Sequence, residues 1–145
     1  MKTIVSMLII IAAGLVSCND DDEATPVDSA QLKAEVTAQL SESTWNVQTV
    51  TVDRLDQNDL FEGFSLSFGD GTFTSQNGGE VWPASGTWQF ANEEATAIVR
   101  DDDTVINIIT LNDFALVISL SWSENTIGLG RTNSISGEHV FTFSK

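Results

Sequence analysis

The chain has 145 residues, of which 6 are Lys or Arg and 21 are Asp or Glu, so its formal net charge at pH 7 is −15. This length supports one domain rather than two. A protein that binds nucleic acid or anionic lipid through charge needs clustered cations, and this chain has too few Lys and Arg to form such a cluster. The composition therefore excludes nucleic acid as an electrostatic partner.

Residues 1–17 have the pattern of an export signal. Lys2 supplies a positive charge near the start, and residues 4–16 are apolar apart from Ser6. This run is shorter than the about 20 residues that a helix needs to span a bilayer. We therefore expect residues 1–17 to be a signal peptide rather than a membrane span.

The only cysteine of the chain, Cys18, follows this apolar run directly. The sequence Leu15-Val16-Ser17-Cys18 resembles a bacterial lipobox, at which signal peptidase II cuts and the cysteine becomes the lipidated first residue. A cysteine in this position is poorly placed to be a catalytic nucleophile or a buried thiol. The resemblance implies that Cys18 carries a lipid anchor, and several acyl chains hold a protein stably on a membrane.

Residues 18–27 are expected to be a disordered tether between the lipidated Cys18 and the domain. The acidic residues 20–23 repel one another and have nothing to bury. An acidic run after the lipidated cysteine also resembles the surface-export signal of lipoproteins from Bacteroidota. Both interpretations stay open, so the expected location is the bacterial outer membrane, on its exterior or its periplasmic face.

The domain is expected to occupy residues 28–145 and to begin with a helix. Leu32, Val36 and Leu40 recur at a spacing of four residues, which places them on one face of a helix. Asp28 or Ser29 is available as the N-cap. The narrow apolar stripe favours a helix that packs on the core, with a partner-binding helix as the alternative.

After Leu40, apolar and polar residues alternate to the C-terminus, which is typical of antiparallel strands with one buried face. The clearest run places Phe114, Leu116 and Ile118 on one face and Val117 on the other. Strands are predicted at residues 43–53, 61–68, 72–77, 85–90, 95–100, 104–111, 114–122 and 138–144.

Short polar turns such as Gly69-Asp70-Gly71 and Asn112-Asp113 join these segments, and turns of this length make hairpins. A meander of short strands must hide its two edges, and a closed barrel does so without crossing connections. The expected fold class is all-β: an antiparallel up-and-down meander closed into a barrel of about eight strands, with the short helix in front. A two-sheet sandwich is the alternative. The connection from Ser123 to Gly137 is expected to contain further strand or to cover a barrel mouth.

Four segments, in this order along residues 40–145, carry a resemblance to a known family. They are residues 43–47 (STWNV), 68–73 (FGDGTF), 85–90 (SGTWQF) and 137–143 (GEHVFTF). Together they resemble the small lipocalin-like domains of Bacteroidota lipoproteins. The resemblance implies a calycin-type barrel, with Trp45 packing across its closed end and an interior that holds an apolar ligand.

Nothing in the sequence singles out a catalytic or metal site. The only histidine, His139, lies in the last predicted strand without a partner at a fixed spacing, so nucleophilic catalysis lacks its usual base. Metal sites built on His and Cys are excluded by their number, and Asp101-Asp102-Asp103 is better explained as a hairpin turn than as a Ca²⁺ site. A carboxylate pair for glycoside hydrolysis stays open, although no pair stands out. We expect no enzymatic activity, no metal and no cofactor.

Aromatic residues are the candidates for a binding site. Those predicted to line the barrel interior are Trp45, Phe64, Phe68, Trp88, Phe90, Phe114 and Trp122. Trp82 lies on a predicted loop just before Pro83, where its ring either contacts a ligand or packs as a cap.

Two functions stay open. The first is a membrane-anchored module that binds a small apolar or amphipathic molecule inside the barrel. The second is a ligandless domain, filled by its own side chains, that contacts another envelope protein; barrels of eight strands are near the size at which either outcome occurs.

Overall fold

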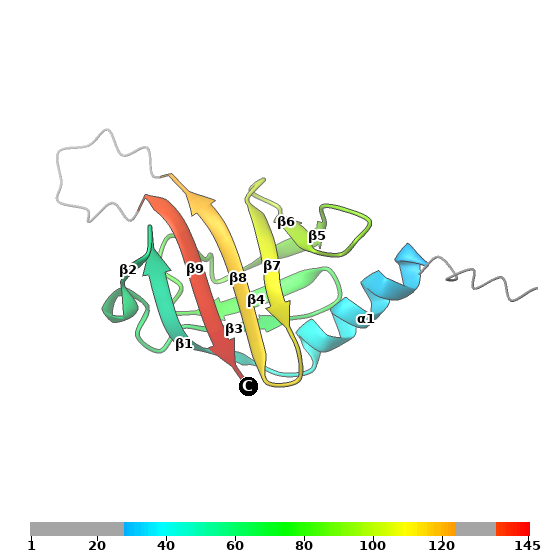
Figure 1. Ribbon diagram of the computed structural model, residues 1–145, viewed down its shortest axis with the longest axis horizontal. Coiled ribbons are helices and arrows are strands. Elements are labelled where there is room, and N and C mark those ends of the chain that lie inside the picture. Colours follow the sequence, from blue (N-terminus) through cyan, green and yellow to red (C-terminus); the bar gives the residue numbers. More distant parts are fainter. Residues whose placement is uncertain (1–27, 124–135) are drawn as a thin grey trace, which may run out of the picture.

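The computed structural model describes residues 28–123 and 136–145, which form one helix followed by a closed antiparallel barrel (Figure 1). The predicted signal peptide, the tether and most of the connection after Ser123 lie outside the described residues. The elements are α1 (Ser29–Ser41), β1 (Trp45–Val52), β2 (Leu55–Asp56), the 3-10 helix η1 (Asn58–Phe61), β3 (Ser65–Phe68), β4 (Thr72–Gln76), β5 (Ser85–Phe90), β6 (Ala97–Arg100), β7 (Val105–Leu111), β8 (Ala115–Trp122) and β9 (Gly137–Ser144).

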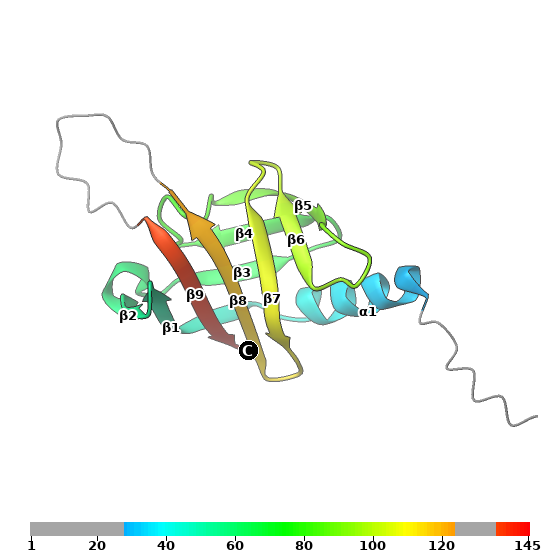
Figure 2. The same ribbon diagram turned by 45° about the horizontal axis from the view of Figure 1, so that its top comes forward.

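The barrel closes because its first and last strands pair with each other. From β3 to β9 each strand pairs with the next one in the chain, and β1 lies between β3 and β9. β2 adds a short ladder to the end of β1 and stays outside the closed ring, so eight strands form the barrel. The predicted fold class is confirmed, and the sandwich alternative is wrong, because a single sheet closes on itself (Figure 2).

The predicted strand at residues 61–68 is wrong in its first half, and β2 was not predicted. Residues Asn58–Phe61 form η1, and β3 begins only at Ser65. Gly63 has a φ of 71°, and the amide of Phe64 donates to the carbonyl of Phe61 at 3.0 Å. Glycine adopts such a left-handed backbone readily, and the resulting turn separates Phe61 from the strand that its alternation had suggested.

α1 begins at the predicted cap and packs on the barrel. The Asp28 carboxylate accepts a hydrogen bond from the amide of Ala30 at 3.1 Å, which satisfies one of the free N–H groups at a helix start. Leu40 is fully buried and Val36 packs against the core. The carbonyl of Leu40 accepts from the indole nitrogen of Trp45 at 2.9 Å, so the end of α1 is tied to the first residue of β1.

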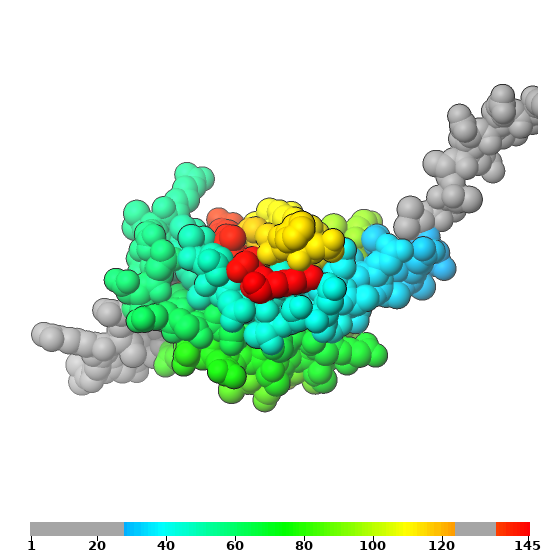
Figure 3. Space-filling model, turned by 90° about the horizontal axis from the view of Figure 1, so that it is seen from below, coloured from blue at the N-terminus to red at the C-terminus, as the bar shows by residue number. Residues whose placement is uncertain are grey.

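One end of the barrel is covered by α1 and by the C-terminal residues. Figure 3 views this end and shows α1 beside the C-terminus and the turn between β7 and β8. Lys145 forms an ion pair with Glu42, just after α1, and its Nζ lies 5.4 Å from the centre of the Trp45 ring. Trp45 is 0% exposed.

Aromatic side chains dominate the core. The largest of those that are almost completely buried are Trp45, Trp82, Phe61, Phe64, Phe73, Phe141 and Phe143. The rings of Phe61 and Phe141 meet edge to face at 5.1 Å, and those of Phe64 and Phe143 at 5.3 Å. Such pairs contribute about 0.5–1.5 kcal/mol each beyond the burial of their area. The protein's own side chains therefore occupy the described part of the interior.

Candidate functional site

Most of the aromatic residues that were predicted to line the interior lie in the core and pack against one another, and Trp88 also lines a hollow of about 210 Å³. Trp45, Phe64, Phe68 and Trp88 are buried, and Phe90 and Trp122 are half-buried and pack against the core. Trp88 contacts Phe68 and Phe90 edge to face, at 6.0 and 5.1 Å. The indole of Trp88 also donates to the carbonyl of Thr72 at 2.9 Å. A role of these residues in ligand binding stays a prediction.

The interior position predicted for Phe114 is wrong, because its side chain is 80% exposed. The side-chain oxygen of Asn112 accepts from the amides of Phe114 and Ala115, each at 2.9 Å. These bonds hold Phe114 in the turn before β8. The inward alternation begins with Leu116, and the prediction extended it two residues too far.

Trp82 lies on the loop between β4 and β5, yet its ring enters the barrel and Trp82 is only 1% exposed. The ring lies 6.0 Å from that of Phe64, 5.7 Å from that of Phe73 and 6.3 Å from that of Phe141. Gly78 allows the loop to fold so tightly, because a Cβ atom there would lie 2.4 Å from the Cβ of Trp82. The packed-cap alternative is confirmed, and contact of an exposed Trp82 ring with a ligand is wrong.

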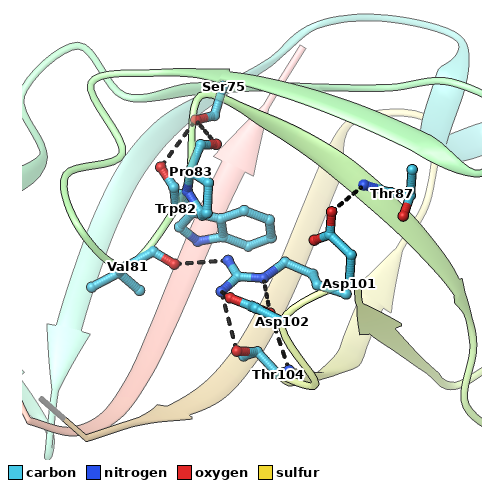
Figure 4. Close-up of polar contacts among 9 residues, drawn as sticks. Ser75, Val81, Trp82, Pro83, Thr87, Asp101, Asp102 and Thr104 are labelled. Atoms are coloured by element: carbon cyan, nitrogen blue, oxygen red, sulfur yellow. Dashed lines mark hydrogen bonds and ion pairs between the residues drawn. The ribbon is translucent and has the colours of Figure 1, made fainter. Parts of the chain in front are cut away.

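Arg100, at the end of β6, holds this loop in place (Figure 4). Its guanidinium carbon lies 4.9 Å from the centre of the Trp82 ring, and Nη1 donates to the carbonyl of Val81 at 2.7 Å. Nε and Nη2 donate to the two carboxylate oxygens of Asp102 at 3.1 and 2.6 Å, and Nη2 also donates to Thr104 at 3.2 Å. Its side chain is completely buried. Arg100 was not among the predicted site residues; the available signal was a lone cation at the end of an apolar strand and directly before three acids.

Further bonds fasten the same loop and keep Asp102 charged. The hydroxyl of Ser75 donates to the carbonyls of Trp82 and Pro83, at 3.3 and 2.8 Å. Burial alone would raise the pKa of Asp102, but hydrogen bonds from Arg100 and Thr104 outweigh it and hold this pKa below its usual value. Asp102 thus remains ionised beside the buried guanidinium, as a buried Arg requires.

His139 points into the barrel from β9 and is completely buried. Phe61 meets its ring edge on at 6.1 Å, and Phe141 stacks on it at 5.8 Å. Nδ1 lies 3.2 Å from the carbonyl of Gly137, which accepts, so Nδ1 carries the proton in the neutral ring. Among the described residues, neither Nε2 of His139 nor the indole nitrogen of Trp82 has a hydrogen-bond partner.

A hollow of about 330 Å³ opens between β1 and η1. It exists because β1 and β3 pair at only two positions, beyond which β1 separates from β3. Its apolar lining comes from Val47, Val50 and Phe61, and its polar lining from Gln48, Asn58, Asp59 and Glu62. In volume it falls at the lower end of small-molecule sites, which span roughly 300–1,000 Å³.

Comparison with known proteins places this chain in no family. No family model matches it, and no curated protein or solved structure gives a significant match.

The described residues place Asp101, Asp102 and Asp103 in the turn between β6 and β7, as the hairpin interpretation predicts. Asp101 accepts from the amide of Thr87 at 3.3 Å, and Asp102 binds Arg100. Over residues 28–123 and 136–145, no group of three or more His, Cys, Asp and Glu is placed to hold a metal ion. Over the same ranges, no helix has the length and apolar character needed to cross a bilayer.

Stability is expected to fall as the pH drops below the ordinary pKa of histidine, 6.5. Desolvation lowers the pKa of His139, and the Gly137 carbonyl and the Asp53 charge oppose this only in part. The unfolded chain therefore binds a proton at a pH at which the folded chain does not, so the folded state loses free energy from pH 6.5 downward until its own pKa is reached. Urea unfolding at pH 7.5 and 5.5 measures this loss, and His139→Phe should reduce it. An equal loss in both proteins would contradict the assignment.

Proposed function

We propose that the protein is a membrane-anchored, lipocalin-like envelope lipoprotein whose barrel acts by contact with another macromolecule rather than by carrying a ligand inside. The packing of the described part of the interior supports this. A barrel that carries a ligand needs an open cavity, commonly some 300–1,000 Å³, whereas here Phe61, Phe64, Trp82, Phe141 and Phe143 pack against one another. The function then lies on the outer surface of the barrel.

Anchoring through Cys18 is part of this proposal. The apolar run, the lipobox-like residues before Cys18 and the acidic residues after it support it. A tether formed by residues 18–27, when fully extended, reaches about 35 Å. The barrel would stay close to the outer membrane, at its exterior or periplasmic face.

A second candidate function, binding of a small amphipathic ligand, is favoured by the hollow between β1 and η1. The half-buried Val47 offers an apolar contact there, and Asp59 and Glu62 place carboxylates in the same lining. This combination suits an apolar molecule with a cationic group, such as a long-chain amine. The site would lie at the seam of the barrel rather than among the aromatic residues of the core.

Native mass spectrometry of the protein extracted from its own envelope separates the two functions. The filled-barrel proposal expects no retained small molecule under conditions that preserve non-covalent complexes: the lipidated chain should appear by itself or with a protein partner. A small molecule that is retained, and lost on denaturation, would contradict it and support the second candidate. In that case Glu62→Lys should abolish retention, whereas Glu80→Lys, on the loop after β4, is the matched control and should not.

A further inference from the structure

Two carboxylates in the hollow between β1 and η1 have no cation paired with them. Asp59 and Glu62 line this hollow of about 330 Å³, and both residues are exposed. Its lining contains no Lys or Arg. The ion pairs among the described residues lie elsewhere, at Lys33–Glu93, Arg100–Asp102 and Lys145–Glu42. The hollow therefore carries negative charge that no described side chain neutralises.

Hydrogen bonds hold the two sides of this hollow in place. The side-chain oxygen of Asn58 accepts from the amide of Val50 at 2.7 Å, and its side-chain nitrogen donates to Asp56 at 3.0 Å. The amide of Gln57 donates to the carbonyl of Val50 at 2.9 Å. These bonds fix η1 against β1, so the hollow is preformed, as binding sites usually are.

Accessible apolar side chains lie in the hollow and next to it. Val47 is a half-buried residue of the lining. Leu60, which lies between two lining residues in η1, is 42% exposed, and Leu55 of the preceding β2 is 67% exposed. Figures 1 and 2 show β2 and the segment after it at one side of the barrel, beside β1. A cation on an aliphatic stem matches this combination of charge and apolar surface.

We infer that this hollow is the docking site for a lysine side chain of a protein partner, an inference that rests on the proposed function of contact with another macromolecule. A lysine ammonium is a compact charge with three donors. Asp59, Glu62 and the side-chain oxygen of Gln48 offer acceptors for them in one lining, and Val47 offers an apolar contact for the four-carbon stem. The net charge of −15 also attracts a basic surface.

The surroundings of the hollow favour a protein over a small amine as the occupant. Gln48, Asp59 and Glu62 are all exposed, so the hollow is open to solvent. A small amine in it would leave much of its own surface in water, whereas sites for small molecules bury about 70–90% of the ligand. A partner protein covers the opening with its own surface and reaches Leu55 and Leu60 as well.

A second copy of this chain is a poorer partner than a different protein. Among the described residues, its lysines Lys33 and Lys145 already form ion pairs with Glu93 and Glu42. Two copies also repel each other, because each carries a formal net charge of −15. The partner is therefore expected to be a different protein with a basic surface.

Carbodiimide coupling in envelopes that contain the full chain tests the inference. The reagent joins a carboxylate to a primary amine in contact with it, as an amide with loss of water, and mass spectrometry of the digest identifies both groups. We expect Asp59 or Glu62 to be joined to a lysine of another protein, at least tenfold more than Glu80, an exposed acid on the loop after β4. About 0.5 M salt should reduce this product about threefold, because it screens exposed charges.

Variants without these charges provide an independent test. Asp59→Asn together with Glu62→Gln should lower the amount of the identified partner that is recovered with the protein at least tenfold. Glu80→Gln together with Glu94→Gln removes the same charge from other positions and should leave this amount unchanged. All four residues are exposed, so both variants should fold, which circular dichroism checks.

Any of three results would overturn the inference. The first is no coupling of Asp59 or Glu62 in the envelope, although both react with added glycine ethyl ester in the purified protein. The second is coupling only to a small amine or to a lysine of this chain, and the third is an equal loss of the partner from the two double variants. The proposed function itself fails only in the separate native-mass measurement, if a small molecule is retained.

Discussion

Arg100→Ala is expected to lower the free energy of unfolding by about 3 kcal/mol, the lower end of the range for removing one partner of a buried ion pair, because the side chain of Asp102 is 36% exposed. The substitution removes the bidentate bond to Asp102, the bond to the carbonyl of Val81 and the contact with the Trp82 ring together. The Val81 carbonyl then lacks this donor, and an unpaired buried polar group costs about 1–3 kcal/mol by itself. Urea unfolding of the purified protein measures the loss.

Two variants show whether this loss comes from the specific geometry of Arg100. Arg54→Ala removes an exposed cation from the β1–β2 turn and should change stability by less than about 0.5 kcal/mol. Arg100→Lys keeps the charge but loses the planar, five-donor group, so its loss should lie between those of the other two. If Arg100→Ala unfolds within 1 kcal/mol of the unaltered protein, Arg100 does not hold the loop in place.

Cys18→Ala is expected to transfer the protein from the membrane fraction to the soluble fraction. Under the proposed anchoring, this substitution removes the only attachment site for acyl chains, because the chain contains no other cysteine. Each buried methylene contributes about 0.8 kcal/mol to membrane binding, so loss of several acyl chains removes essentially all affinity. Detergent phase partitioning of cell extracts, with detection of the protein by antibody, measures the change.

A matched variant separates lipidation from a general failure of export. Ser43→Ala, between α1 and β1, should remain in the membrane fraction with the unaltered protein. Mass spectrometry of the N-terminal peptide should find the lipid on Cys18 in both of them and find none in Cys18→Ala. If Cys18→Ala stays in the membrane fraction to the same extent as the unaltered protein, the proposed anchor is wrong.

Local patterns predicted those parts of the fold that local forces decide. Leu116 and Ile118 of β8 lie on one face of a strand with period-two alternation, Phe141 and Phe143 of β9 alternate with polar residues, and all four are buried as expected. Asp28 caps α1 because an N-cap depends only on the residues that follow it. Strand pairing also followed from the sequence, since short polar turns leave neighbouring strands little choice but to pair.

Features that depend on contacts between distant residues were not predictable in this way. Trp82 looks like a loop residue, and its burial depends on Phe73 of β4, Phe141 of β9 and Arg100 of β6. A buried Arg requires partners that its neighbours in sequence supply only in part, since the Val81 carbonyl comes from another loop. The interior position predicted for Phe114 was wrong for the opposite reason: a local hydrogen bond from its own amide to the side chain of Asn112 overrides the alternation.

The pairing of β1 with β9 also governs the order in which the molecule forms. Asn46 pairs with Ser144, so closure of the barrel joins residues from opposite ends of the domain. Contacts between residues so far apart in sequence slow folding, because the chain loses the entropy of loop closure before these contacts can stabilise it. During synthesis, β1 leaves the ribosome long before β9, and the edge of β1 that pairs with β9 stays unpaired until then. The barrel is thus a single cooperative unit, completed only when the last strand arrives. A chain that ends before β9 would keep two open edges, on β1 and β8, and would be prone to aggregate rather than to form a smaller barrel.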